Sequence, residues 1–191
     1  GDDKPWWAVG QWAAQYERQA VALTEAERQD VYASAARCGL LFEVALAPMW
    51  YGTGDGQQLA PSTSRTVIRT DTGEAFKVVG SEYELIQNAL GLSFTRDLTL
   101  AGDNRVRTMG TLANGRQCFT LIDMPDMVIT DEAHYPYVLT SWAHDMTMPL
   151  ISGPVIERAV CRNTVRIGVG QMGRFKVRVR HTGNVELKAT E

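Results

Sequence analysis

A run of basic side chains near the C-terminus is the feature of this sequence best suited to bind an anion. Between Arg174 and Arg180, Arg or Lys occupies every second position and alternates with Phe175, Val177 and Val179. Successive side chains of a β-strand point to opposite faces, so the pattern predicts four cations on one face and an apolar opposite face. Neighbouring cations would be roughly 6.6 Å apart, close to the phosphate spacing of a stretched nucleic acid strand.

Further basic side chains precede this predicted strand. Arg162 and Arg166 are four residues apart, so they share a face of a short helix predicted from Cys161 to about Val169. Asn163 or Thr164 would cap this helix, and an exposed helix N-terminus beside arginines would equally favour a phosphate; both interpretations stay open. The predicted anion-binding residues are Arg158, Arg162, Asn163, Arg166, Arg174, Lys176, Arg178 and Arg180, with Arg69 and Lys77 of a central hairpin as further contributors.

The net charge of −3 hides an uneven distribution along the chain. Residues 151–191 contain eight Lys or Arg and three Asp or Glu, whereas residues 1–150 contain 11 and 19. A basic surface on a mildly acidic protein indicates an anionic partner that is met on one face. The alternative is a solvated edge strand, because proteins place Lys and Arg on such strands to block aggregation. Four cations without an intervening acid exceed what edge protection needs, so we favour the anionic partner.

Histidines offer little enzyme chemistry here. His144 and Asp145 are adjacent, so in a strand they point in opposite directions and form no direct dyad. His134 and His181 have no Asp, Glu or Cys at a spacing that completes a metal site. We interpret each histidine as a structural or surface residue.

A second set of candidate catalytic residues lies on a predicted hairpin. Asp71, Glu74 and Lys77 resemble the carboxylate–lysine set of a nuclease, but Asp71 is better explained as a turn residue before Gly73. The sequence has no phosphate-binding loop, nucleophile elbow or zinc-protease motif. We therefore predict no enzyme, no cofactor and no metal site, and a metal-dependent nuclease is the weakest alternative.

Length and composition indicate one globular domain over residues 1–191. Hydrophobic residues make up 45% of the chain, and no apolar run approaches the roughly 20 residues that a membrane helix needs. Three widely spaced cysteines favour a reducing compartment without disulfides, and the N-terminus does not have the pattern of a signal peptide. Residues 1–23 carry Trp6, Trp7, Trp12 and Tyr16; we interpret this segment as an aromatic packing arm, with base stacking as the alternative.

Turn and cap signals predict an α+β fold with a mostly antiparallel, hairpin-rich sheet and helices packed on one side. A capping box at Thr24 begins a helix to about Ala36, and a second box at Ser81 begins a helix through Leu90. Asp71-Thr72-Gly73 and Asn114-Gly115 mark hairpin turns, and the Gly- and Ser-rich residues 52–64 read as a mobile loop. The predicted strands are residues 41–50, 65–70, 75–80, 106–112, 117–123, 137–143, 149–160 and 174–180.

Several motifs of the chain are similar to those of a known protein family. They include Pro5-Trp6-Trp7-Ala8-Val9-Gly10, Arg69-Thr70-Asp71-Thr72-Gly73, His144-Asp145, Arg158-Ala159-Val160-Cys161-Arg162-Asn163-Thr164 and Arg180-His181-Thr182-Gly183-Asn184. On these, the chain resembles the phage/plasmid-like family of uncharacterised proteins, a domain of unknown function found in prophages, phages and plasmids. The chain departs from the family at Trp7, where His is frequent, and at Met146-Thr147, where Gly-Ser or Gly-Thr follows His-Asp. The resemblance also implies a further C-terminal tail.

The resemblance implies a mobile genetic element as context and the cytoplasm of a bacterial host cell as location. The layout of a hairpin-rich sheet with a basic strip is also similar to that of single-strand annealing proteins such as RecT and Red-beta, an analogy of fold alone. We therefore expect a single-stranded DNA-binding, ATP-independent annealing protein of recombination that acts as a homo-oligomer, a ring or filament, without a membrane. The alternative is a protein-interaction or anti-defence module whose basic strip docks on an acidic host protein.

Overall fold

The computed structural model describes residues 23–52, 59–102, 104–124, 127–129, 132–134, 137–155, 166, 169–170, 172 and 176–181. Helices α2 (Glu25–Gln29) and α3 (Val31–Arg37) come first. The capping box at Thr24 is present: its hydroxyl accepts from Glu27 N at 3.3 Å, and the Glu27 carboxylate accepts from Thr24 N at 2.7 Å. The single helix predicted here is divided at Asp30, because this residue leaves the helical region and its side chain caps α3.

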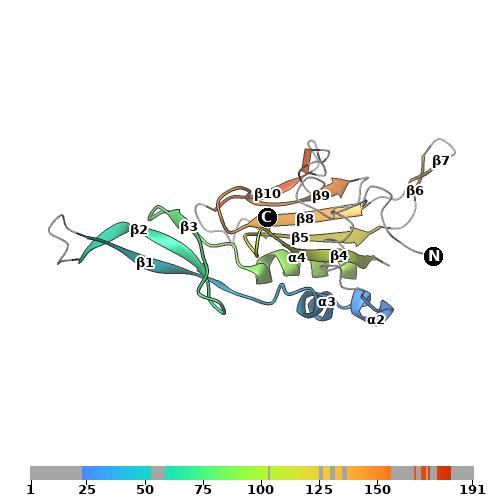
Figure 1. The fold of residues 1–191 in the computed structure, drawn as a ribbon. Helices are drawn as coiled ribbons and strands as arrows, with labels where there is room; N and C mark the ends of the chain where they lie inside the picture. The colour runs from blue at the N-terminus through green and yellow to red at the C-terminus, as the bar shows by residue number, and fades with distance from the viewer. Residues whose placement is uncertain are drawn as a thin grey trace, which may run out of the picture.

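A three-stranded antiparallel sheet, here called the arm, projects from one end of the molecule (Figure 1). It consists of β1 (Val44–Gly52), β2 (Leu59–Arg69) and β3 (Ala75–Val79), in that order. Gly73 adopts φ 71° in the predicted turn between β2 and β3. The prediction of a loop over residues 52–64 was wrong for residues 59–64, because the backbone of β2 from Leu59 to Pro61 pairs with the end of β1. Residues 53–58 lie outside the described part.

A five-stranded antiparallel sheet, here called the body sheet, forms the larger part of the molecule (Figure 1). Its strands are β4 (Arg105–Leu112), β5 (Gln117–Asp123), β8 (Tyr137–Ala143), β9 (Leu150–Val155) and β10 (Val177–Val179), in the order β10-β9-β8-β5-β4. Strands β6 (Met127–Ile129) and β7 (Glu132–His134) form a small separate hairpin. The antiparallel α+β fold predicted from the sequence is confirmed.

The hairpin turn between β4 and β5 has three consecutive residues with positive φ. Ala113, Asn114 and Gly115 adopt φ values of 51°, 58° and 90°. Asn and Gly tolerate this left-handed region better than other residues, so the Asn-Gly pair places the turn where the sequence predicts it. The predicted strands on either side are confirmed.

Helix α4 (Asn88–Leu100) lies against β5 and β8 of the body sheet. The predicted helix from Ser81 through Leu90 was wrong: residues 83–87 are not helical. The amide of Glu84, which would receive the Ser81 cap, instead donates to the carbonyl of His181 at 3.0 Å. Gly91, the residue after the predicted end of this helix, lies inside α4, where an added Cβ would be 2.5 Å from the ring of Trp142.

Both faces of the body sheet are buried, each by a separate hydrophobic cluster. The first lies on the side of the helices and includes Leu92 of α4, Trp142, Leu150 and Val179. The second lies on the opposite side and consists of Phe119, Leu121, Leu139, Ile151, Val155 and Met172, with Val169 packed against it. The helices α2–α4 therefore cover one face, and residues close to the C-terminus contribute to the cover of the other.

Candidate nucleic-acid interface

Within the described residues, strand β10 is an edge strand of the body sheet and pairs with β9. Val177, Arg178 and Val179 lie opposite Ser152, Ile151 and Leu150. The strand is shorter than the predicted residues 174–180, because Lys176 and Arg180 flank it without belonging to the ladder. Residues 174 and 175 lie outside the described part.

Arg178 projects from the face of the body sheet that is opposite to α4. Cross-strand partners share a face, and the partner of Arg178 is Ile151, a member of the second cluster. Val179 lies opposite Leu150 and belongs to the first cluster, on the helical side. Arg178 is exposed and Val179 is fully buried, so the alternation predicted from the sequence holds at these two positions.

The prediction that Val177 lies in the core was wrong. Half of its surface, 50%, is exposed. Val177 shares the face of Val179, but α4 packs on β5 and β8, away from this edge of the sheet. Val177 is therefore an apolar side chain at the rim of the helical layer.

The exposed cations around β10 have no acidic partner. Lys176, Arg178, Arg180 and Arg166 are all exposed and form no ion pair with any residue that the structure describes. We call Lys176, Arg178 and Arg180 the basic edge. Arg158, Arg162, Asn163 and Arg174, the other predicted binding residues of this region, lie outside the described part.

The end of β10 is held in place by His181. Its two ring nitrogens lie 3.2 Å from the carbonyl oxygen of Glu84 and 3.1 Å from that of Met148. The ring also stacks on Tyr83, with 4.8 Å between the ring centroids. These contacts fix the backbone next to Arg180, so the basic edge is a positioned row of charges rather than a loose tail.

The two predicted contributors on the arm differ from each other. Arg69 donates to both carboxylate oxygens of Asp71, at 2.6 and 2.8 Å, and its guanidinium lies 4.0 Å from the centroid of the Phe42 ring. Arg69 is thus engaged in structural contacts. Lys77 is exposed on the edge strand β3 and forms no ion pair within the described residues.

Sequence reasoning missed Arg65 as a candidate. Arg65 is exposed on β2 and, like Lys77, forms no ion pair with a described residue. Arg65 lies opposite Val79 and Lys77 lies opposite Val67, so the two cations are diagonal neighbours across the hairpin. The predicted hairpin contains both cations, but their diagonal placement depends on a register shift between Val67 and Ile68 that the turn does not predict.

The arm joins the body through an aromatic cluster. The ring of His144 packs edge-on against Phe42, at 5.7 Å between centroids, and is stacked with Phe76 at 6.0 Å. The Arg116 guanidinium lies 5.8 Å from the Phe76 ring and pairs with Glu74 at 3.2 Å. Residues of the arm, of the β4–β5 turn and of the β8 end therefore meet in one cluster.

The buried amide of Asn88 organises the polar groups beneath this cluster. Its Nδ2 donates to Phe42 O at 2.9 Å, and this orients the amide so that Oδ1 accepts from Trp142 Nε1 at 2.8 Å and from His144 Nε2 at 2.9 Å. His144 therefore carries its proton on Nε2 when neutral. The thiol of Cys118 also donates to this oxygen, at 3.4 Å.

Burial decides the ionisation of the two titratable groups in this network. The pKa of His144 is lowered to about 4, mainly by burial and also by the charge of His181, while Asp145 and the backbone of Ile86 oppose the change. Burial also raises the pKa of the Cys118 thiol, and Arg69 opposes this rise. A neutral imidazole and a neutral thiol, both fully buried, make this a core network.

Asp145 has a separate local role. Its Oδ1 accepts from the amide and the hydroxyl of Thr147, which forms a tight turn. Met146, in the middle of this turn, has φ 65°. The left-handed conformation favours glycine, so methionine at this position carries a backbone cost.

The carboxylates of the nuclease-like set are each paired with an arginine. Asp71 binds Arg69, whose hydrogen bonds lower the pKa of this carboxyl, and Glu74 binds Arg116. Within the described residues, no group of three or more His, Cys, Asp or Glu side chains is arranged to hold a metal ion. Nor does the described part contain a helix that is both long and apolar enough to span a membrane.

A comparison with protein families gives one match. The family model described as a domain of unknown function, DUF932, matches residues 75–191, which include β3, α4, the body sheet and the basic edge. Searches of the curated proteins and of the solved structures gave no match.

Proposed function

The chain belongs to the DUF932 family, and we propose that this member binds single-stranded DNA along the basic edge of the body sheet. The observation that carries the proposal is the set of exposed cations at Lys176, Arg178 and Arg180, which have no acidic partner among the described residues. Lys176 and Arg180 are each two residues from Arg178, so neighbouring charges of the row are roughly 6.6 Å apart. A flexible single strand can follow such a row with successive phosphates.

The electrostatic cost of the basic edge supports an anionic partner. Like charges at this spacing repel, and no described carboxylate offsets them, whereas carboxylates lie against most arginines elsewhere. Binding through phosphates would release counterions and would be tolerant of sequence. Arg166, which is also exposed and forms no ion pair with a described residue, is a further candidate contact.

The proposal includes annealing by an oligomer. The three cations of one basic edge cover only a few phosphates, so a useful site needs edges from several subunits side by side. Residues 1–150 have a net negative charge and residues 151–191 a net positive charge. Neighbouring subunits could therefore also attract one another. The similarity in layout to single-strand annealing proteins stays a prediction.

A fluorescently labelled oligonucleotide titrated with the protein tests this proposal directly. We expect binding at about 50 mM salt that weakens as salt rises, with a slope of about 0.7 per phosphate contact. The particle size, measured with and without oligonucleotide by light scattering, should increase on binding if the oligomer assembles on the strand. Absence of binding at about 50 mM salt would remove the proposal.

A second candidate function follows from the position of β10 at a sheet edge. One side of this short strand is unpaired in the described structure, so an acidic segment of another protein could add a strand there. Charge reversal at Lys176, Arg178 and Arg180 distinguishes the two candidates. Loss of a protein partner from a pull-down, with no DNA binding by the wild type, would favour this interaction module.

A further inference from the structure

The outer part of the arm exposes two aromatic side chains. Trp50 is 56% exposed and Tyr51 is 57% exposed. Adjacent residues of a strand point to opposite faces, so the arm presents an aromatic ring on each face. At this level the described part of the arm has two strands, because Trp50 pairs with Pro61 whereas β3 pairs with β2 between Arg65 and Ile68. Among the described residues, no third strand covers the rings.

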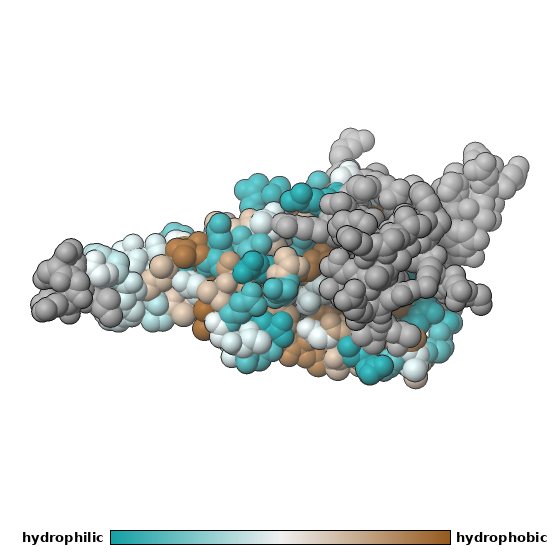
Figure 2. Space-filling view, viewed as in Figure 1, coloured by the Kyte–Doolittle hydropathy of each residue, from teal (hydrophilic) through white to brown (hydrophobic). Residues whose placement is uncertain are grey.

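The charged side chains on the three strands of the arm have one sign. Its three strands contain the cations Arg65, Arg69 and Lys77 and contain no Asp or Glu. Arg69 is held by Asp71 of the turn, which leaves Arg65 and Lys77 exposed and without an acidic partner among the described residues. In Figure 2 the visible surface of the arm is mostly pale or brown, whereas deep teal, the colour of the most hydrophilic residues, gathers over the body.

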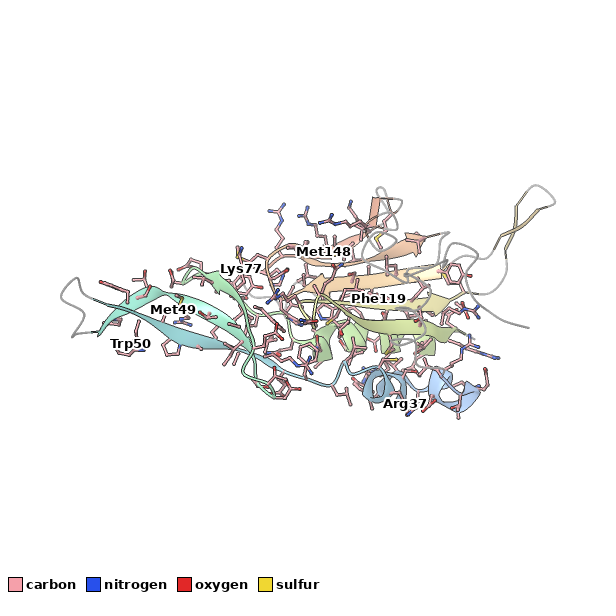
Figure 3. The ribbon with its side chains drawn as sticks, viewed as in Figure 1. Arg37, Met49, Trp50, Lys77, Phe119 and Met148 are labelled. Atoms are coloured by element: carbon pink, nitrogen blue, oxygen red, sulfur yellow. The ribbon has the colours of Figure 1, made fainter. Side chains whose placement is uncertain are left out.

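Strand pairing places these side chains in sequence along the arm. Lys77 is level with Val67, and Arg65, two residues further out on β2, is level with Pro48 of β1. Trp50 follows two residues beyond Pro48, and each step of two residues spans roughly 6.6 Å. Figure 3 shows Lys77 near the base of the arm and Trp50 towards its outer end.

We infer that the arm is a second contact surface for single-stranded nucleic acid, with Arg65 and Lys77 at phosphates and Trp50 and Tyr51 stacked on bases. This inference rests on the proposed function and adds the arm to its binding surface. Cations followed by exposed aromatic rings are the combination that single-strand binders use, because a ring stacks only on a base that is not paired in a duplex. The basic edge alone offers phosphate contacts and would bind duplex as well.

The competing occupant of the aromatic rings is a second copy of the chain. Two arms that meet would bring Arg65 and Lys77 of one copy towards the same cations of the other, and the arm strands hold no carboxylate to offset them. The charge of the arm therefore favours a polyanion over another arm. A measurement that distinguishes contacts to bases from contacts to phosphates decides between nucleic acid and a second copy.

The test compares a thymidine oligonucleotide with an abasic oligonucleotide of the same length and charge. The wild type should bind the thymidine oligonucleotide more tightly. Substitution of both Trp50 and Tyr51 by Ala should weaken that binding by about 10-fold or more and leave the abasic affinity unchanged. Phe at both positions should retain the preference for bases. Tyr32→Ala, at an exposed tyrosine of α3, is the matched control and should bind as the wild type does.

The salt dependence of binding tests the cations of the arm separately. Replacing Arg65 and Lys77 by Gln should reduce the slope of log affinity against log salt by about 1.4 on either oligonucleotide, because two phosphate contacts are lost. The same variant should keep its melting temperature, since neither side chain has an ion pair to lose in the described structure.

The outcomes separate the inference from the proposed function. If the wild type binds neither oligonucleotide, the proposed function fails and the inference fails with it. If the wild type binds and the Trp50/Tyr51 double variant binds equally well, the basic edge stands and the inference is wrong. If that variant keeps its affinity but sediments as a smaller particle, the rings contact a second copy, and this result overturns the inference too.

Discussion

The arginines of the body and those of the basic edge are the same residue type in opposite surroundings. Arg28 illustrates the first group: it pairs with Asp123 at 2.6 Å and donates to Val106 O at 2.9 Å. Arg178 illustrates the second, because it is exposed and has no acidic partner in the described structure. Arg28 thereby connects α2 to the body sheet. Position within the fold, rather than residue type, separates the paired arginines from the unpaired cations that we propose to bind nucleic acid.

This difference predicts that the two groups respond to different measurements. Removing a paired arginine should lower the free energy of unfolding and leave nucleic-acid affinity unchanged. Removing an unpaired cation should do the reverse. The following changes test this separation.

The largest effect is expected from the basic edge. Replacing Lys176, Arg178 and Arg180 together by Ala should lower the affinity for a single-stranded oligonucleotide by about 100-fold at low salt and reduce the salt slope by about 2. The melting temperature should stay the same or rise, because repulsion is removed. The matched control replaces three exposed, paired arginines, Arg37, Arg96 and Arg105, by Ala. Equal losses of affinity in both variants would show that only overall charge matters.

The next largest effect concerns acid and the buried network of the body. His144 has a folded pKa of about 4 against an ordinary value of 6.5, so its contribution to stability is fully present above pH 6.5. As the pH falls from 6.5 to 4, the unfolded chain binds a proton that the folded chain does not, and the free energy of unfolding should fall by about 3 kcal/mol. Denaturant unfolding at a series of pH values measures this loss.

The control for this acid effect is His144→Gln, which keeps a donor for Asn88 but does not titrate. Its stability should be lower than that of the wild type at neutral pH and should depend less on pH between 6.5 and 4. Parallel curves for the two proteins would contradict the assignment of the effect to His144.

A smaller effect is expected from the paired group itself. Arg28→Ala removes the bonds to Asp123 and to the Val106 carbonyl and should destabilise the fold by about 1–2 kcal/mol, with unchanged affinity for an oligonucleotide. Arg96→Ala, which loses only the exposed pair with the adjacent Asp97, should change stability much less than Arg28→Ala does. Chemical denaturation of both variants checks the order.

The smallest effect is expected at Met146, which lies in neither group of cations. Met146→Gly relieves the positive φ of this exposed residue and should stabilise the fold by roughly 0.5 kcal/mol, after the greater flexibility of glycine in the unfolded chain is subtracted. Met146→Ala keeps the positive φ and should give no such gain. A gain of the same size from Ala would show that the methionine side chain, rather than its backbone, carries the cost.

Local signals in the sequence predicted the parts of the fold that depend on neighbouring residues. The Thr24 capping box and the Asn114-Gly115 turn form as expected, because each is decided within a few residues. The Ser81 box failed because the amide it needs is taken by His181, which is 97 residues from Glu84 along the chain. Long-range packing also explains Gly91, whose absent side chain makes room for the Trp142 ring.

The candidate site was predictable to a similar extent. The alternation around β10 follows from the period of a strand, and Arg178 and Val179 lie on the faces expected. Whether an arginine is paired with a carboxylate depends on its neighbours in the folded chain, and the sequence alone does not show these. Arg69 is paired with Asp71, whereas Arg65 of the same strand is not paired within the described part. The exposure of Trp50 likewise depends on where β3 ends.

The base of the arm is held by two consecutive amides, and this has a mechanical consequence. Gln87 Nε2 donates to Val44 O at 2.7 Å and its Oε1 accepts from Val44 N at 3.1 Å, as the backbone of an adjacent strand would. Asn88, the next residue, binds Phe42 O and begins α4. A force applied at the outer end of the arm is therefore carried through these two side chains to the first turn of α4. A displacement of the arm is thereby coupled to the start of α4 at Gln87 and Asn88.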